Sequence, residues 1–338
     1  MKKVTYPIKY ISLNIIKTKK NKILNKITKN NLLKKDNVQK NHVVIKVEYS
    51  NLNYKDFLMA QGHAGLIKKF PHTPGIDASG TIYYSNSNKF NKNDKVFVIA
   101  QPLGVEVNGS FSEYISVPDN WVEKLPKGLT SKEIMMIGTS GFTAIKAFNK
   151  SLKTILKYKD KPVLITGATG NVGLFLIFLL KNIGINIEAT TTKTKNNLVL
   201  KRLGVKKIYQ LKNFLKTPNF SLLNEKYSVV FENLGGDLIS ICLKYLITKG
   251  ILVSIGNILG NSSNINILPL ILREVSILSV NAECSNTNER KNILKTFKSI
   301  KLKRQILKRT KIINLKEVSK IIKFQNYNKK ILRYVVKI

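Results

Sequence analysis

The sequence predicts an α/β protein in which a β-rich first region precedes a doubly wound parallel sheet. One observation is a buried apolar strand that breaks into an apolar helix at Gly167, Gly170 and Gly173. A second is the alternation of strand-like and helix-like runs up to residue 255, which is typical of right-handed βαβ units. A third is the strand-like run 333–337, which indicates that the C-terminus rejoins the first region.

The three glycines have the GxxGxxG spacing of a dinucleotide-binding turn. In such a turn one glycine permits a tight bend, another lets the backbone approach a pyrophosphate, and another lets the helix lie against the strand. The N–H groups at the start of the helix then face the anion. Strand, turn and apolar helix occur in the order that this mechanism needs. The segment therefore favours a dinucleotide site over an ordinary tight turn between a strand and a helix.

The composition is strongly basic. The 338 residues, enough for two domains, include 58 Lys and Arg against 19 Asp and Glu, a net charge of +39 that would attract any polyanion. However, Lys, Asn and Ile are abundant along the whole chain, and the charge is not gathered into one tail or helix. No nucleic-acid motif accompanies it. We therefore expect no dedicated nucleic-acid site.

Cysteine usage and hydropathy indicate a soluble, cytoplasmic protein. Cys242 and Cys284 lie far apart in apolar or small polar surroundings, which is typical of reduced thiols. Two cysteines cannot build a tetrahedral cysteine cluster for zinc. The basic N-terminus lacks the apolar core of a signal peptide, and the most apolar run, 172–180, is too short to span a bilayer.

The first region contains mainly strand patterns. Residues 1–40 alternate apolar residues with lysines and predict edge strands and a mobile loop. Alternation over 43–49 predicts a half-buried strand, and an Asn or Ser can cap a short helix within 51–60. A loop with two prolines, 70–80, leads into a strand punctuated by glycines. Further strands are expected at 95–100 and 111–117.

The second region begins with a capping box, because Glu133 follows Thr130 by three residues. The helix that starts there leads into 138–144 and a second helix. The following strands are expected at 162–166, 185–191, 206–211, 227–232 and 250–255, with helices that end near 183, 203 and 246. In the tail we expect helices around 289–300 and 316–324.

The end of the second strand of a dinucleotide fold selects the cofactor, by an acid for NAD or by hydroxyl and basic groups for NADP. Here Thr191 stands at the expected strand end and Lys193 follows it, which favours NADPH. Two alternatives remain. Glu188 would select NAD if the register were three residues earlier, and the run of threonines could reflect β-propensity alone.

Four motifs together resemble the zinc-independent medium-chain dehydrogenase/reductase superfamily, and most of all its acryloyl-CoA reductase branch, which is similar to quinone oxidoreductases. The resemblance extends from about residue 43 to the C-terminus. The motifs are Asn53-Tyr54-Lys55-Asp56, Pro74-Gly75-Ile76-Asp77-Ala78-Ser79-Gly80-Thr81, Ile137-Gly138-Thr139-Ser140-Gly141-Phe142-Thr143-Ala144 and Thr166-Gly167-Ala168-Thr169-Gly170-Asn171-Val172-Gly173.

The resemblance implies a GroES-like catalytic domain over 1–137, an inserted Rossmann NADP-binding domain over 138–276, and a return to the catalytic domain over 277–338. It also implies NADPH-dependent reduction of acryloyl-CoA to propionyl-CoA. Zinc-dependent relatives place a metal-binding His-Glu pair where this chain has Ile76-Asp77, so the resemblance implies no metal. The run 275–280 could be an edge strand that pairs two sheets into a homodimer.

The resemblance also assigns residues. Asn171 and Thr192 replace usual glycines, Lys193 replaces an arginine, and Leu332 stands where a glycine usually precedes Arg333. Lysine lacks the planar bidentate grip of arginine, so weaker discrimination for NADPH is expected. The implied cofactor-binding residues are Tyr54, Gly167, Thr169, Gly170, Asn171, Val172, Gly173, Thr191, Thr192, Lys193, Asn257, Ile271, Ala282 and Asn328.

The candidate catalytic residues are Asn53, Tyr54 and Asp56. Reduction of an enoyl thioester places transient negative charge on the thioester oxygen, so Asn53 and Tyr54 are expected as donors or orienting groups and Asp56 as a supporting or proton-relay group. Alternatively, Asn53 and Asp56 could only cap their helix, Tyr54 could only pack, and Asp77 is expected to pin the turn that follows it.

Two other functions remain open. One is reduction of a quinone or small enone on the same scaffold, because fold and cofactor do not choose the substrate. The other is binding of RNA or another polyanion by a retained nucleotide fold.

Overall fold

The computed structural model describes residues 9–31, 38–218, 220–299, 306, 308–323 and 333–338. They form two compact units. The described residues within Met1–Thr139, Phe297–Tyr327 and Leu332–Ile338 form the first unit, and those within Ser140–Thr296 form the second. Residues 277–296 thus group with the second unit, whereas we expected them in the segment that returns to the first.

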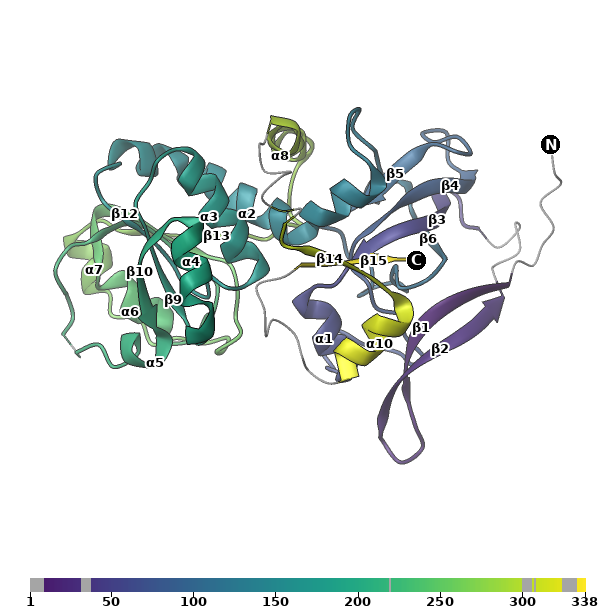
Figure 1. Cartoon of the computed structure of the whole chain (residues 1–338), viewed down its shortest axis with the longest axis horizontal. Coiled ribbons are helices and arrows are strands. Elements are labelled where there is room, and N and C mark those ends of the chain that lie inside the picture. The colour runs from purple at the N-terminus through teal and green to yellow at the C-terminus, as the bar shows by residue number, and fades with distance from the viewer. Residues whose placement is uncertain (1–8, 32–37, 219, 300–305, 307, 324–332) are drawn as a thin grey trace. The chain divides into compact units, whose positions relative to one another are not determined.

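The second unit is built on a six-stranded sheet whose neighbouring strands are all parallel (Figure 1). The strand order is β10-β9-β8-β11-β12-β13, so the chain reverses direction at β8 and β11, as in dinucleotide-binding sheets. The strands are β8 (Val163–Ile165), β9 (Ile187–Thr191), β10 (Val205–Gln210), β11 (Tyr227–Glu232), β12 (Leu246–Ser254) and β13 (Ser276–Ser279).

Helices connect these strands, and one of them explains the most apolar run of the sequence. Residues 173–180 of α3 are all buried, because this helix packs on β8 and β9. On β11 and β12 the packing helix is α6. The helices of this unit are α3 (Asn171–Asn182), α4 (Asn197–Leu203), α5 (Leu211–Phe214), α6 (Leu238–Leu243), α7 (Leu268–Leu272) and, for most of its length, α8 (Thr287–Ser299), with the 3-10 turn η3 (Thr194–Asn196) before α4.

The first unit contains a mostly antiparallel sheet in the order β14-β15-β3-β4-β5-β7, with β6 paired to β3. The closing strand β15 lies parallel to β14 and antiparallel to β3, which confirms that the C-terminus rejoins the first region. The strands are β3 (His42–Asn51), β4 (Ala78–Asn86), β5 (Lys95–Val98), β6 (Tyr114–Pro118), β7 (Glu123–Lys124), β14 (Thr310–Asn314) and β15 (Arg333–Lys337).

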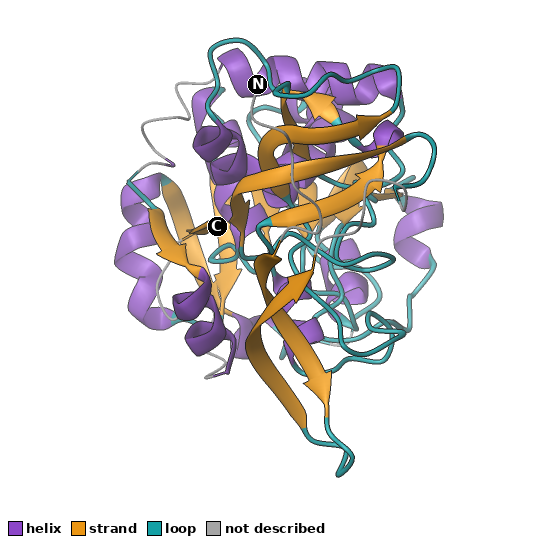
Figure 2. Ribbon diagram, turned by 90° about the vertical axis from the view of Figure 1, so that its right-hand side faces the viewer, coloured by secondary structure: helices purple, strands orange, loops and turns teal. Residues whose placement is uncertain are grey.

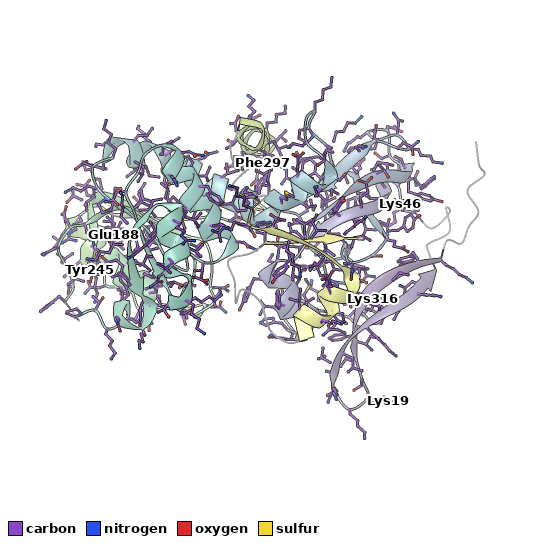
Figure 3. The ribbon with its side chains drawn as sticks, in the orientation of Figure 1. Lys19, Lys46, Glu188, Tyr245, Phe297 and Lys316 are labelled. Atoms are coloured by element: carbon purple, nitrogen blue, oxygen red, sulfur yellow. The ribbon has the colours of Figure 1, made fainter. Side chains whose placement is uncertain are left out.

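The expected edge strands near the N-terminus are a hairpin of β1 (Lys9–Lys17) and β2 (Ile23–Asn31). It extends from the first unit in Figure 2, and Figure 3 marks Lys19 at its turn. Among its described residues the unit also contains the helices α1 (Tyr54–Ala60), the first part of α2 (Ser131–Lys157) and α10 (Leu315–Lys323), and the 3-10 turn η2 (Asp119–Trp121).

The structure also differs from the expected boundaries of α6, β12 and β6. Helix α6 ends at Leu243 and β12 already begins at Leu246, where we expected a helix to 246 and a strand from 250. The strand expected at 111–117 begins only at Tyr114. The two helices expected to meet around 138–144 are present as two segments of α2 that meet at Gly138, whose φ of 54° interrupts the helix.

A buried lysine explains why 277–296 belongs to the second unit. Lys146 of α2 donates from Nζ to the Asn281 carbonyl at 3.0 Å and to Ser285 Oγ at 2.9 Å, and it lies 3.3 Å from Glu289 Oε2. In addition, β13 pairs with β12. These contacts hold the segment after β13 to the second sheet.

Candidate active site

The glycine turn lies between β8 and α3, and its structure agrees with the roles that the spacing predicts. Gly167 has a φ of +58°, which favours glycine, and a Cβ there would lie 2.9 Å from Leu234 Cδ2. A Cβ on Gly173 would lie 2.7 Å from Ala168 Cα, because the helix approaches the turn closely. Gly170 precedes the helix and donates its N–H to the Gly167 carbonyl at 2.9 Å.

Helix α3 begins directly after this turn, with Asn171 and Val172 as its first residues. Its twelve residues give an aligned set of peptide dipoles whose positive end favours an anion. The neighbouring Thr169 is buried, and its Oγ1 lies 3.5 Å from Oγ1 of Thr191. The turn and the end of β9 therefore meet at the carboxyl edge of the sheet, where such folds bind dinucleotides.

A cavity of about 330 Å³ opens at this edge. Thr191, the last residue of β9, is buried and accepts the Lys193 N–H on Oγ1 at 3.0 Å. Burial lowers the pKa of the Lys193 ammonium. No carboxylate is among the described residues that line the cavity. The lining residues are Thr191, Thr192, Thr194, Gln210, Leu211 and Lys212.

Lys212 is a residue that sequence reasoning missed. It lies on α5, directly after β10, and the sheet places the end of β10 beside the end of β9 through the pair Gln210 and Thr191. The position of Lys212 directly after a predicted strand was a possible signal, because adjacent parallel strands end at the same edge of a sheet. The identity of the adjacent strand, however, is a property of the sheet order.

Glu188, the alternative cofactor selector, is labelled in Figure 3 and is bonded to side chains of its own unit. It is the second residue of β9, and its Oε2 accepts hydrogen bonds from Lys226 Nζ at 2.6 Å and from the hydroxyls of Tyr209 and Tyr227 at 2.8 Å each. Burial raises the pKa of Glu188, but these three donors outweigh burial and hold it below its ordinary value. The carboxylate is thus paired within the unit, away from the strand end.

The remaining expected cofactor residues of the second unit are spread along its chain. Asn257 and Ala282 lie just beyond the ends of β12 and β13, and Asn257 is exposed whereas Ala282 is buried. Ile271 lies on α7 with 62% of its surface exposed. Asn328 lies outside the described residues.

In the first unit, the candidate catalytic residues start α1. Asp56 is fully buried, and its two carboxylate oxygens accept the N–H groups of Asn53 at 2.7 Å and Gly75 at 2.9 Å. Burial, with the nearby Asp77 carboxylate adding to it, raises the pKa of Asp56 to about 8. Asp56 therefore caps the helix and ties it to the loop that contains Gly75.

Asn53 and Tyr54 differ in accessibility. The Asn53 side chain is buried, and its Nδ2 donates to Asn51 Oδ1 at 2.5 Å and to Asp77 Oδ2 at 3.0 Å. Both amide hydrogens are thereby used, so this arrangement favours an orienting role over donation to a substrate. Tyr54 has 39% of its surface exposed.

Asp77 differs from its expected role. We expected it to pin the turn that follows it, but its side chain accepts hydrogen bonds from Asn51, Asn53 and Thr139. The turn expectation was wrong because these partners come from other parts of the first unit. Among the described residues, no group of three or more His, Cys, Asp or Glu side chains could hold a metal ion.

Comparison with known proteins identifies the family. Residues 39–127 match the alcohol dehydrogenase GroES-like domain, and residues 171–299 match the zinc-binding dehydrogenase family. The putative quinone oxidoreductase YhfP of Bacillus subtilis is 32% identical over 247 residues, which are 73% of this chain and 75% of that protein. The chain belongs to the medium-chain dehydrogenase/reductase superfamily. This confirms the resemblance and the predicted fold class.

Other members of the medium-chain dehydrogenase/reductase superfamily are similar over most of their length. The acrylyl-CoA reductase AcuI of Ruegeria pomeroyi is 30% identical over 71% of this chain and 73% of that protein. The crystal structure of YhfP, with NAD bound, has a TM-score of 0.88 at 27% identity, covering 98% of this chain and 100% of that one. The Salmonella enterica yhdH oxidoreductase, in complex with NADP, has a TM-score of 0.87 at 25% identity and the same coverage.

The chain is therefore an oxidoreductase of the medium-chain dehydrogenase/reductase superfamily that uses a nicotinamide dinucleotide. Among the helices that the structure describes, none is both long and apolar enough to cross a membrane.

Proposed function

We propose that this chain uses NADPH to reduce the C=C bond of acryloyl-CoA, or of a similarly short enoyl thioester, to the saturated thioester. The observation that carries the proposal is the cavity at the end of β9, which Thr191, Thr192 and Lys212 line without a carboxylate among its described lining residues, and beside which the Lys193 backbone N–H is bonded to Thr191. The substrate class is supported by the likeness to AcuI of Ruegeria pomeroyi.

The residues at the carboxyl edge fit a dinucleotide with a 2′-phosphate. Gly167 and Gly173 let the turn pack closely against Leu234 and Ala168, and the start of α3 suits a pyrophosphate. A phosphate in this cavity would meet threonine hydroxyls and the ammonium group of Lys212, and Lys193 follows two residues after Thr191. Glu188, which would favour NAD if it stood there, is paired with Lys226.

The reaction adds a hydride at the β-carbon of the enoyl thioester and a proton at the α-carbon, and negative charge develops on the thioester oxygen in between. NADPH, when bound, supplies the hydride. The protein must orient the thioester and donate a hydrogen bond to that oxygen. We assign the donor role to the hydroxyl of Tyr54, and the orienting role to Asn53 and Asp56, which hold the first turn of α1.

The decisive measurement is the loss of reduced-nicotinamide absorbance with acryloyl-CoA, run with NADPH and with NADH, and repeated with a simple quinone and a free enone. We expect turnover with NADPH and acryloyl-CoA, and slower turnover with NADH. Turnover with quinones or free enones only would instead support the quinone reductase function, which the likeness to YhfP favours.

A third outcome of these assays would point to the function that the net charge of +39 suggests. If no combination of cofactor and substrate is turned over, while RNA binds with an affinity that falls steeply with salt concentration, the reductase proposal is wrong and polyanion binding replaces it.

A further inference from the structure

Asp77 is a buried carboxylate at the centre of a hydrogen-bond cluster in the first unit. Its Oδ2 accepts hydrogen bonds from Asn51 Nδ2 at 2.8 Å, from Asn53 Nδ2 at 3.0 Å and from the Thr139 backbone N–H at 3.0 Å. The Thr139 hydroxyl donates to Oδ1 at 2.5 Å. Four donors from two separate segments of the chain thus converge on one side chain with no exposed surface.

None of the ion pairs among the described residues includes Asp77. Its partners are instead the neutral amides, hydroxyl and backbone N–H just named. Burying a charged carboxylate is costly unless it is well hydrogen-bonded, and a buried donor left unpaired is costly as well. Loss of any one of these hydrogen bonds would leave a buried polar group unpaired. The cluster is therefore a rigid support for the residues in it.

The backbone of α2 fits around this carboxylate. Gly138 has a φ of +54°, and a Cβ there would lie 1.9 Å from Asn51 Nδ2 and 2.9 Å from Asp77 Oδ2. Directly after this kink, Asp77 accepts the N–H of Thr139, as acidic groups do at helix starts. Before the kink, the Met135 carbonyl accepts a hydrogen bond from Asn51 Nδ2 at 3.1 Å. The kink and the cluster are thus one structural unit.

The cluster also reaches α1. Asn53, held by Asp77 and Asn51 through its side chain, is the N-cap residue of α1, and its own N–H is held by Asp56. Tyr54 follows it directly as the first residue of the helix. Hydrogen bonds to both the side chain and the backbone N–H of Asn53 therefore fix the orientation of this first turn.

We propose that Asp77 is a positioning residue of the reductase: it fixes the Asn53 amide and, through it, the placement of Tyr54 at the start of α1. The proposal rests on the proposed function, in which Tyr54 contacts the substrate. Asp77 itself acts only through its neighbours. Neither the glycine motif nor the cofactor edge of the second unit takes part in this cluster.

The test compares Asp77→Asn with Ser79→Ala. Asparagine keeps the size of the side chain, but it removes the charge and one acceptor. Ser79 lies two residues further along, on β4, is equally buried and donates to the Ser131 carbonyl of α2 at 2.8 Å. In Asp77→Asn we expect kcat to fall about 10- to 100-fold, with the affinity for NADPH unchanged within about twofold. Ser79→Ala should retain the wild-type kcat.

A double-mutant cycle separates positioning from a general loss of stability. If Asp77 acts through Asn53, then Asp77→Asn should lower kcat much less in an Asn53→Ala background than in the wild type. If Asp77→Asn lowers kcat by the same factor in the Asn53→Ala background as in the wild type, the proposal is overturned. If Asp77→Asn does not fold, Thr139→Val, which removes one donor to the carboxylate, replaces it in the cycle with a smaller expected effect.

A second readout needs no activity. With 3-fluorotyrosine incorporated throughout the chain, the 19F resonance of Tyr54 is assigned by its loss in Tyr54→Phe. We expect it to shift or broaden in Asp77→Asn, or in Thr139→Val, and to stay unchanged in Ser79→Ala. An unchanged Tyr54 resonance in the folded variant would refute the positioning role. A shifted resonance in an enzyme that does not reduce acryloyl-CoA would keep the positioning role and reject only the proposed substrate.

Discussion

At the scale of single residues, cofactor choice depends on which charged side chains reach the end of β9. Lys212 lines the cavity there, Lys193 follows two residues after Thr191, and Glu188 is bonded to Lys226 and two tyrosine hydroxyls. A lysine contributes a point charge without the bidentate geometry of arginine. The chain should therefore prefer NADPH over NADH by a smaller factor than an enzyme with an arginine at this edge.

Replacing Lys193 or Lys212 by alanine tests this preference. Each variant should raise the KM for NADPH about tenfold or more, because a charge-assisted contact to the 2′-phosphate is lost, and should leave the KM for NADH nearly unchanged. Steady-state kinetics with both cofactors give the answer. Lys216→Ala is the matched control for Lys212→Ala, since Lys216 is exposed just beyond α5 and, unlike Lys212, does not line the cavity. An equal rise for NADPH and NADH would contradict the assignment.

The buried Asp56 predicts a dependence of stability on pH. Its pKa in the folded protein is raised to about 8, from 3.8 for an exposed carboxyl. Between these values the folded state keeps a proton that the unfolded state has lost, so this group's contribution to the free energy of unfolding is full below pH 4 and is lost as the pH rises to about 8.

In Asp56→Asn the free energy of unfolding should therefore fall less steeply between pH 4 and pH 8 than in the wild type. The expected difference in slope is about 1.4 kcal/mol per pH unit, the value for one proton. Urea unfolding at a series of pH values measures both slopes. Parallel pH profiles for the two proteins would show that Asp56 has an ordinary pKa.

At the scale of elements, the contact between α3 and the β8–α3 turn determines whether the dinucleotide edge forms. The apolar helix can lie against the turn only because position 173 has no side chain, since a Cβ there would overlap the Ala168 backbone. Backbone atoms cannot move aside as a flexible side chain can. The helix would therefore have to shift as a whole, and with it the N–H groups at its start.

Gly173→Ala should consequently destabilise the fold by about 1–3 kcal/mol and weaken NADPH binding by more than tenfold. Gly184→Ala is the control for backbone effects, because Gly184 follows the same helix with a φ of +75° and open space around it. It should cost about 1–2 kcal/mol from the left-handed backbone alone, without a change in NADPH affinity. Thermal unfolding and cofactor titration of both variants measure the difference.

At the scale of the whole molecule, the outermost strand β13 leaves an edge of the second sheet without a described neighbour. Ile277 on this strand and Ile271 and Leu272 on α7 are exposed. An unpaired edge flanked by apolar side chains is a template for pairing with another chain. We propose that two copies pair through this edge to form the homodimer. The net charge of +39 on each copy opposes their association.

Sedimentation at low and at high salt tests this assembly. The dimer fraction should rise with salt, because screening weakens the repulsion between copies. Ile277→Lys should shift the chain to monomers at both salt concentrations while retaining the fold. Lys19→Glu, at the turn of the β1–β2 hairpin, is the control and should leave the oligomeric state as it is. A wild-type chain that is monomeric at every salt concentration would reject the proposed edge pairing.

The sequence alone was sufficient for features that depend on neighbours along the chain. The glycine spacing predicted the β8–α3 turn, and the Thr130–Glu133 capping box is present, with hydrogen bonds of 2.9 Å and 3.2 Å. The alternation of strands and helices predicted the parallel sheet. The turn and the capping box follow from backbone geometry within a few residues, and the parallel sheet follows from the order of strand and helix patterns along the chain.

Only the tertiary structure decided which distant side chains meet. Glu188 is removed from cofactor selection by Tyr209, Lys226 and Tyr227, which come from β10 and from the start of β11. Asn53 was a candidate hydrogen-bond donor to the substrate, but its side-chain amide donates to Asp77 instead. A polar side chain bonds to whichever partner folding buries beside it, and burial makes that bond costly to break. That partner depends on the packing of the whole unit, which no local pattern of the chain contains.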